Sequence, residues 1–211
     1  MYQSRETGLA ERVVRINQPI HEDNANWIMM ELVALDQQET DDSIRVEIRC
    51  DGGSVYGGLG IYDVMRQCRS TLMTVGYQVS GIAALLLAAG TRGYRVLDPM
   101  GLVTLVPLMQ GASGVEGVLV QREVTRLEKR ILDGLYACTN LTPESLPALR
   151  EWTLQPHEAI QLGLADQIMA GGGNGGGHRP FHRGLQLDAD GVAGSRGLSP
   201  DGDGDGQWAD I

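Results

Sequence analysis

The chain is short of three residue types whose abundance marks whole classes of protein. It has 3 cysteines, 4 histidines and 1 phenylalanine among 211 residues. The cysteines, Cys50, Cys68 and Cys138, are too few and too scattered for a disulfide framework or a paired zinc site, so we expect reduced and mostly buried thiols. We accordingly predict no metal site and no cofactor.

Long hydrophobic runs and a basic surface are also missing. No apolar stretch approaches the ~20 residues that a membrane-spanning helix requires. Residues 1–12 mix charged and polar side chains without the apolar centre of a secretory signal. The formal net charge is −10, with 17 basic against 27 acidic side chains. Nucleic-acid binding needs a basic face that neutralises phosphates, so neither nucleic acid nor membrane is an expected partner.

Composition divides the chain after Ala170. The segment 171–211 carries 13 of the 29 glycines and includes an alternating Asp-Gly run at 201–206. Such a segment has little apolar surface to bury, and glycine makes ordering entropically costly. We therefore predict a domain over 1–170 and a flexible, disordered extension over 171–211.

The first 170 residues alternate between patterns typical of strands and of helices. Period-two alternation and β-branched residues predict strands over 11–17, 44–50, 72–78, 93–97 and 102–106. Helical spacing of apolar residues predicts helices over 23–36, 56–66, 82–89, 117–138, 145–150 and 156–162. Asp23 or Asn24 is the expected N-cap of the first helix. Alternating elements of this kind indicate an α/β fold.

Three separated motifs carry a resemblance to a known family. They are Cys50-Asp-Gly-Gly-Ser-Val55, the segment from Gly76 to Gly90 ending Leu-Leu-Ala-Ala-Gly, and Glu158-Ala-Ile-Gln-Leu-Gly-Leu-Ala-Asp166. Over about 11–169 the chain resembles the proteolytic subunit of Clp protease, the ClpP family. The resemblance implies a ClpP/crotonase-like fold of repeated ββα units, with a protruding handle helix that corresponds to 118–136.

The catalytic positions of that family are occupied here by unsuitable residues. A serine peptidase needs a nucleophile, a base within hydrogen-bond reach and a group that orients the base. Counting back from the Leu-Leu-Ala-Ala-Gly sequence puts Gly81 at the nucleophile position. The histidine position falls on Val106, which Pro107 follows, and the aspartate position on Glu151. The resemblance therefore implies a degenerate triad and no catalytic residue.

The hydrogen-bond donors for an oxyanion are the one catalytic feature of the family that the sequence retains. Gly53, in the glycine turn, and the amide of Ile82, after the nucleophile position, match the residual oxyanion hole that the resemblance implies. Asp51 replaces the family's proline in this turn and adds a negative charge.

In its degenerate triad the chain resembles the ClpR subunits, a branch of the ClpP family. Gly93-Tyr-Arg95 also looks ClpR-like, whereas 51–60 lacks an insertion that many ClpR chains carry. The resemblance implies a non-catalytic subunit that assembles with active ClpP-type and other ClpR-type chains into two stacked seven-membered rings. An ATP-driven AAA+ unfoldase feeds such rings. The implied location is the chloroplast stroma, with the cytoplasm of a cyanobacterium-like cell as the alternative.

Two other functions stay open at this point. Ser80 lies one residue before the nucleophile position, so an active ClpP-like endopeptidase that uses Ser80 is one alternative. A crotonase-type acyl-CoA enzyme, which shares the fold superfamily and a paired-amide oxyanion hole, is the other.

Overall fold

A computed structural model describes residues 11–38, 42–107, 114–145 and 151–170, with only the backbone for 114–118. The chain divides into two compact units, Met1–Gly171 and Gly172–Ile211. All described residues belong to the first unit, so the extension predicted over 171–211 lies outside them.

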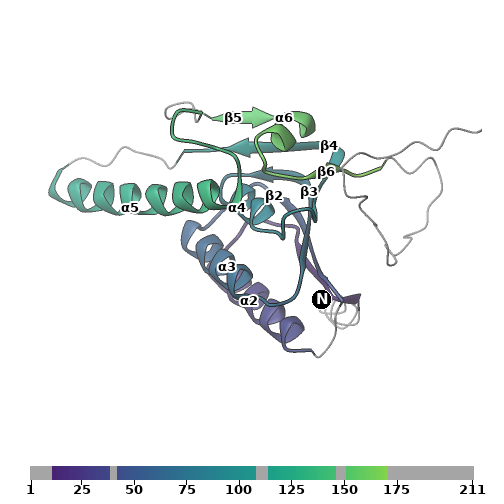
Figure 1. Ribbon diagram of the computed structural model, residues 1–211. Helices are drawn as coiled ribbons and strands as arrows, with labels where there is room; N and C mark the ends of the chain where they lie inside the picture. The colour runs from purple at the N-terminus through teal and green to yellow at the C-terminus, as the bar shows by residue number, and fades with distance from the viewer. Residues whose placement is uncertain (1–10, 39–41, 108–113, 146–150, 171–211) are drawn as a thin grey trace, which may run out of the picture. The chain divides into compact units, whose positions relative to one another are not determined.

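The centre of the first unit is a sheet with strand order β1-β2-β3-β4-β5, in which β6 also pairs with β4 (Figure 1). The strands are β1 (Val13–Ile16), β2 (Ile44–Cys50), β3 (Leu72–Ser80), β4 (Arg95–Leu105), β5 (Trp152–Leu154) and β6 (Gln167–Ile168). The pairs from β1 to β4 are parallel, as is β4–β6, whereas β5 runs antiparallel to β4. This is a mixed α/β fold, as expected for the ClpP family.

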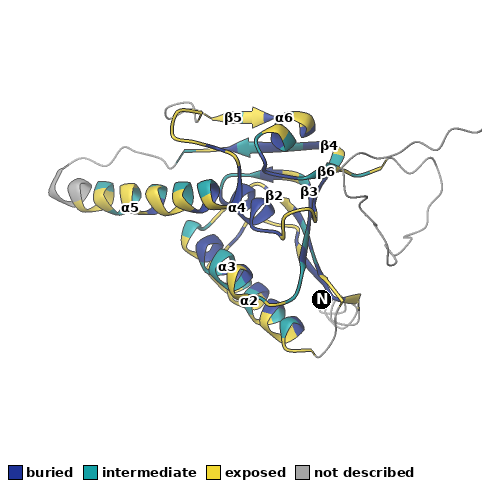
Figure 2. Cartoon of the chain, in the orientation of Figure 1, coloured by how far each residue is buried: buried dark blue, intermediate teal, exposed yellow. Residues whose placement is uncertain are grey.

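A helix connects each successive pair of parallel strands. The helices are α2 (Glu22–Asp36), α3 (Val55–Gln67), α4 (Ile82–Ala88), α5 (Gly114–Cys138) and α6 (Pro156–Gln161). Figure 2 shows α2 with one buried and one exposed side: Ile28 and Leu32 are buried, whereas Trp27 and Met30 are exposed. Within the described residues no helix combines the length and hydropathy that a membrane span would need.

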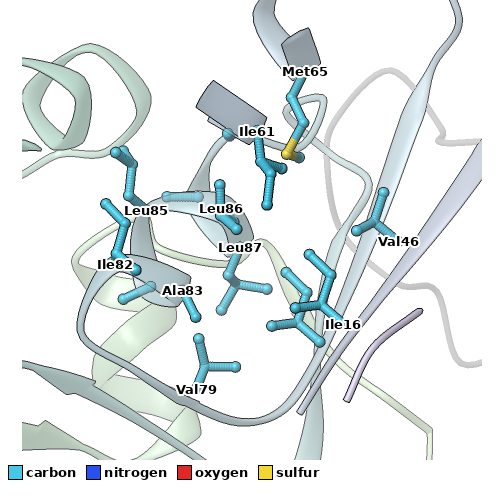
Figure 3. Close-up of a cluster of buried hydrophobic side chains, with 14 of the residues drawn as sticks. Ile16, Val46, Ile61, Met65, Val79, Ile82, Ala83, Leu85, Leu86 and Leu87 are labelled. Atoms are coloured by element: carbon cyan, nitrogen blue, oxygen red, sulfur yellow. The ribbon is translucent and has the colours of Figure 1, made fainter. Parts of the chain in front are cut away.

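Helix α4 lies in the middle of the core. All seven of its residues are buried, and Leu85, Leu86 and Leu87 have no exposed surface (Figure 3). Neighbours from several elements surround it, among them Ile61 of α3 and Val79 of β3. Burial of each leucine side chain contributes about 1.5–3 kcal/mol. Its uniformly apolar sequence is explained by contact on every side.

Most elements match their sequence predictions to within three residues, and β2 matches at both ends. The predicted strands 93–97 and 102–106 form one strand, β4, whose register against β3 jumps: Gly76 pairs with Leu97 and Gln78 with Leu102. The strand is therefore irregular opposite Tyr77, and two separately paired segments follow one another within β4. The helix predicted over 145–150 lies almost wholly outside the described residues.

The predicted N-cap of α2 was wrong. His21 occupies that position, with extended backbone at φ −122° and ψ 163°. Asn24 contributes from the N3 position instead, where its side-chain oxygen accepts a hydrogen bond from the His21 amide at 2.7 Å. The sequence offers several capping residues in a row, and the backbone path from Ile20 decides among them.

Candidate functional site

Gly81 forms the turn between β3 and α4. It is the N-cap of α4 and has φ 57° and ψ −128°, a combination that residues with a side chain adopt only under strain. Its amide donates to the carbonyl oxygen of Thr104 at 2.9 Å, which ties the turn to β4. A Cβ atom added here would meet only the Gly52 Cα, at 3.8 Å. This is the sharp strand-to-helix turn on which some hydrolases present a nucleophile, with open space where the side chain would be.

The glycine turn at Gly52-Gly53 lies against the Gly81 turn. Both glycines have positive φ, 106° and 120°. A Cβ on Gly52 would lie 3.4 Å from the carbonyl oxygen of Ser80, which shows how closely the two turns approach.

Ile20 holds the glycine turn in place. Its amide donates to the Gly52 carbonyl at 2.8 Å, and its carbonyl accepts from the Ser54 amide at 2.7 Å. A Cβ on Gly53 would come within 2.3 Å of the Ile20 carbonyl oxygen, so only glycine fits this contact. Sequence reasoning missed Ile20, because its partners are more than thirty residues away and no local pattern marks them.

The residues of this turn are otherwise chemically inert. The Cys50 thiol donates to the Gly52 carbonyl at 3.2 Å, and burial raises the pKa of that thiol, so it remains protonated. The Asp51 side chain is exposed and points its charge to solvent.

Val106 and Glu151 come together through strand pairing. Leu105 of β4 is opposite Trp152 of β5, so the next antiparallel pair in this register is Val106 with Glu151. Ser80 pairs with Thr104, which places Val106 two residues, or about 7 Å, further along the sheet. Gly81, Val106 and Glu151, the residues that the sequence analysis assigned to the three catalytic positions, therefore lie at the same end of β3, β4 and β5. Val106 and Glu151 are both exposed.

Ser80 ends β3, and it belongs to a row of hydroxyl groups across the sheet. It pairs with Thr104, which pairs in turn with Thr153, and the two threonine hydroxyls are 3.1 Å apart. Among the described residues no side chain that could act as a base is hydrogen-bonded to Ser80.

The two described histidines belong to other elements. His21 caps α2, and His157 is an exposed residue in the first turn of α6. Ile82, the other predicted oxyanion donor, is the first residue of α4, and its buried side chain packs against Gly58 of α3. The two glycine turns thus lie together, and neither described histidine belongs to the strands or helices that form them.

Known proteins supply an independent comparison. The family model for Clp protease matches residues 1–172. A protein from Deinococcus radiodurans, described as "ATP-dependent Clp protease proteolytic subunit", is 34% identical over 170 residues, which cover 76% of this chain and 81% of the relative. Both findings favour the ClpP resemblance over the crotonase-type alternative. The chain belongs to the Clp protease family.

Proposed function

We propose that this chain is a non-catalytic structural subunit of a Clp protease core, of the ClpR type. The observation that carries the proposal is Gly81: the position from which a nucleophile would project holds a glycine, in a turn whose geometry would otherwise present one. Loss of the nucleophile or the base alone removes nearly all the catalysis of a serine peptidase, as the subtilisin series demonstrates. Here both are missing.

Assembly with active subunits is the second part of the proposal. Helix α5 is 25 residues long, and Leu119 and Val120 near its start are exposed by 62% and 51%. Apolar residues on a long helix call for a partner surface. Members of the ClpP family form rings and work with AAA+ chaperones, so the surface that covers α5 is best supplied by another ClpP-type or ClpR-type chain. Residence in the chloroplast stroma follows from the ClpR assignment alone, and cell fractionation tests it.

A serine-directed probe tests the catalytic part. The chain is assembled with an active ClpP-type partner, treated with a fluorophosphonate and analysed by mass spectrometry of each subunit. We expect label on the partner's serine and none on this chain. The Ser80→Ala variant is the matched control, because Ser80 directly precedes Gly81 and is the alternative nucleophile.

Two results would contradict the proposal. Label on this chain that disappears in Ser80→Ala would establish an active peptidase that uses Ser80. A chain that remains a stable monomer at micromolar concentration and does not enter a ring with ClpP-type partners, as judged by native mass spectrometry, would refute the structural role.

A further inference from the structure

A cavity of about 400 Å³ opens where the C-terminal ends of α3, α4 and α5 meet; we call it the three-helix cavity. Cys68 follows α3, Ala89 and Gly90 follow α4, and Cys138 ends α5. The Gly81 turn lies at the other end of α4, about 10 Å away for seven residues of helix. The cavity is therefore separate from the candidate site, and its volume is within the range of small-molecule pockets, about 300–1,000 Å³.

The lining is positively charged although the protein is acidic. Arg66 and Arg92 line the cavity, and no aspartate or glutamate does. The net charge of the whole chain is −10, so this local excess of positive charge is the reverse of the average surface. Both arginines are exposed, and neither forms an ion pair with any residue in the described part of the chain.

A carboxylate close to the cavity residue Cys68, that of Asp36, is already engaged in hydrogen bonds. Asp36 accepts hydrogen bonds from the amides of Arg69 and Ser70 at 2.9 and 2.7 Å. Burial alone would raise its pKa, but the hydrogen bonds from Ser70 and Arg69 outweigh this and the pKa lies below its usual value. The charge of Asp36 is thus partly compensated by these amides and by the Arg69 side chain, 3.9 Å away.

Helix C-termini normally repel anions, because their free carbonyls carry partial negative charge. Here a buried guanidinium binds some of these carbonyls. Nη1 of Arg95, a residue that is 3% exposed, donates to the carbonyls of Ala88 and Cys138 at 3.2 and 2.8 Å. One carbonyl at each of two helix ends that face the cavity is therefore hydrogen-bonded, while the charge of Arg95 itself is paired with Asp166.

Neutral donors and an apolar floor complete the lining. The Thr91 hydroxyl accepts from the Leu72 amide at 3.0 Å, which leaves its own proton free to donate. Burial raises the pKa of the Cys68 thiol to about 11, so this side chain is uncharged. Met65 and Leu72 contribute apolar surface.

We propose that the three-helix cavity binds a small molecule bearing phosphate or carboxylate groups, held by Arg66 and Arg92, with its apolar part against Met65 and Leu72. Two arginines that face one cavity without carboxylate partners suit an oxyanion, which each guanidinium binds through charge-assisted hydrogen bonds. The proposal does not depend on whether the subunit is catalytic.

Isothermal titration calorimetry of the full chain, in its assembled form and at low ionic strength, tests this. Inorganic pyrophosphate represents phosphate ligands and citrate represents carboxylate ligands. We expect saturable binding of at least one probe. Arg66→Gln or Arg92→Gln should weaken it by about tenfold each, the loss of one charge-assisted hydrogen bond, and the double variant should abolish measurable binding.

Two further variants separate this site from general charge effects. Arg69→Gln is the matched control, because the Arg69 side chain is 83% exposed, lies next to the cavity and does not line it. Its binding constant should stay within about twofold of the wild-type value, since exposed charges contribute little. Ala137→Phe places a ring in the cavity without a change of charge and should abolish binding.

Each possible result is decisive. Binding of pyrophosphate alone, of citrate alone or of both supports the proposal and identifies the class of oxyanion. Failure of both probes to bind overturns it. Binding that survives in the double arginine variant or in Ala137→Phe also overturns it, because the oxyanion would then be bound elsewhere. Far-UV circular dichroism verifies that every variant is folded.

Discussion

Arg95, which is buried, and Asp166, which is partly buried, form an ion pair that links residues 71 positions apart in the sequence. Nε and Nη2 of Arg95 donate to the two carboxylate oxygens at 2.9 and 2.5 Å, and the amides of Gly93 and Arg95 donate two more hydrogen bonds at 2.7 and 3.1 Å. The same guanidinium binds the ends of α4 and α5 through Ala88 and Cys138. One side chain thus fastens β4, the segment before β6 and two helix ends together.

Replacement of Arg95 by methionine should therefore unfold the domain far more easily. Removal of one member of a buried pair leaves the other charge uncompensated and costs about 3–5 kcal/mol. Urea denaturation of the full chain measures this. The control is Lys129→Met, which breaks an exposed pair with Asp133 and should cost less than about 1 kcal/mol. Equal costs for both variants would show that Arg95 is not a structural link.

Because of the same ion pair, we expect the free energy of unfolding to fall at low pH. Burial alone would raise the pKa of Asp166, but the hydrogen bonds from Arg95 and Gly93 dominate and hold that pKa below its usual value. A depressed pKa in the folded state stabilises the fold at pH values above the unfolded pKa, near 4. That stability is lost as the pH falls through the folded value. The free energy of unfolding should thus fall below about pH 4 in the wild type, and less steeply in Asp166→Asn. Parallel pH profiles would contradict the assignment.

Two glycines of the candidate site should differ sharply in their tolerance of alanine. Gly53 and Gly81 both have positive φ, but a Cβ on Gly53 would lie 2.3 Å from the Ile20 carbonyl oxygen, whereas one on Gly81 has open space. Gly81→Ala should cost about 1–3 kcal/mol from backbone strain alone. Gly53→Ala should cost more, because the backbone of Ile20 must also move. Thermal unfolding of the two variants side by side is the measurement, and a larger loss for Gly81→Ala would contradict the description of the turns.

Restoration of all three catalytic side chains should not restore an efficient protease. In the variant Gly81→Ser, Val106→His, Glu151→Asp the new serine has space, but the new histidine lies on an exposed strand end beside Pro107. A displacement of even 1 Å between reacting groups costs about a hundredfold in rate, so we expect turnover at least about a hundredfold below that of an active subunit. The assay is cleavage of a fluorogenic peptide by rings whose ClpP-type partners carry a nucleophile Ser→Ala change. Near-normal turnover would show that the scaffold is still organised for catalysis.

The exposed side chains of Leu119 and Val120 on α5 should govern assembly. The double change Leu119→Gln and Val120→Gln replaces these two apolar side chains by polar ones and should shift rings to smaller species in native mass spectrometry. Arg122→Gln, an exposed change on the same helix, is the control and should assemble normally. Unimpaired assembly of the double variant would exclude this surface as a subunit contact.

Local sequence determined most helices and strands, and it determined that Gly81 and Val106 carry no reactive side chain. Alternation of β-branched residues gives β2 its bounds, and a continuous apolar run gives α4, because both signals lie within a few neighbouring residues. The sequence alone likewise shows that residue 81 has no hydroxyl and residue 106 no imidazole. The family itself could be inferred from three motifs, and the comparisons confirm it.

Tertiary structure decided which distant segments meet. The three-residue strand β5 gave no periodic signal, yet its antiparallel pairing with β4 places Glu151 beside Val106. Residues tens of positions apart are joined at three places. These are the contact of Ile20 with the glycine turn, the Arg95–Asp166 pair and the cavity between three helix ends. Such contacts depend on the register of the whole sheet and on the close packing of α4 beneath it, and neither is encoded in any local stretch of the chain.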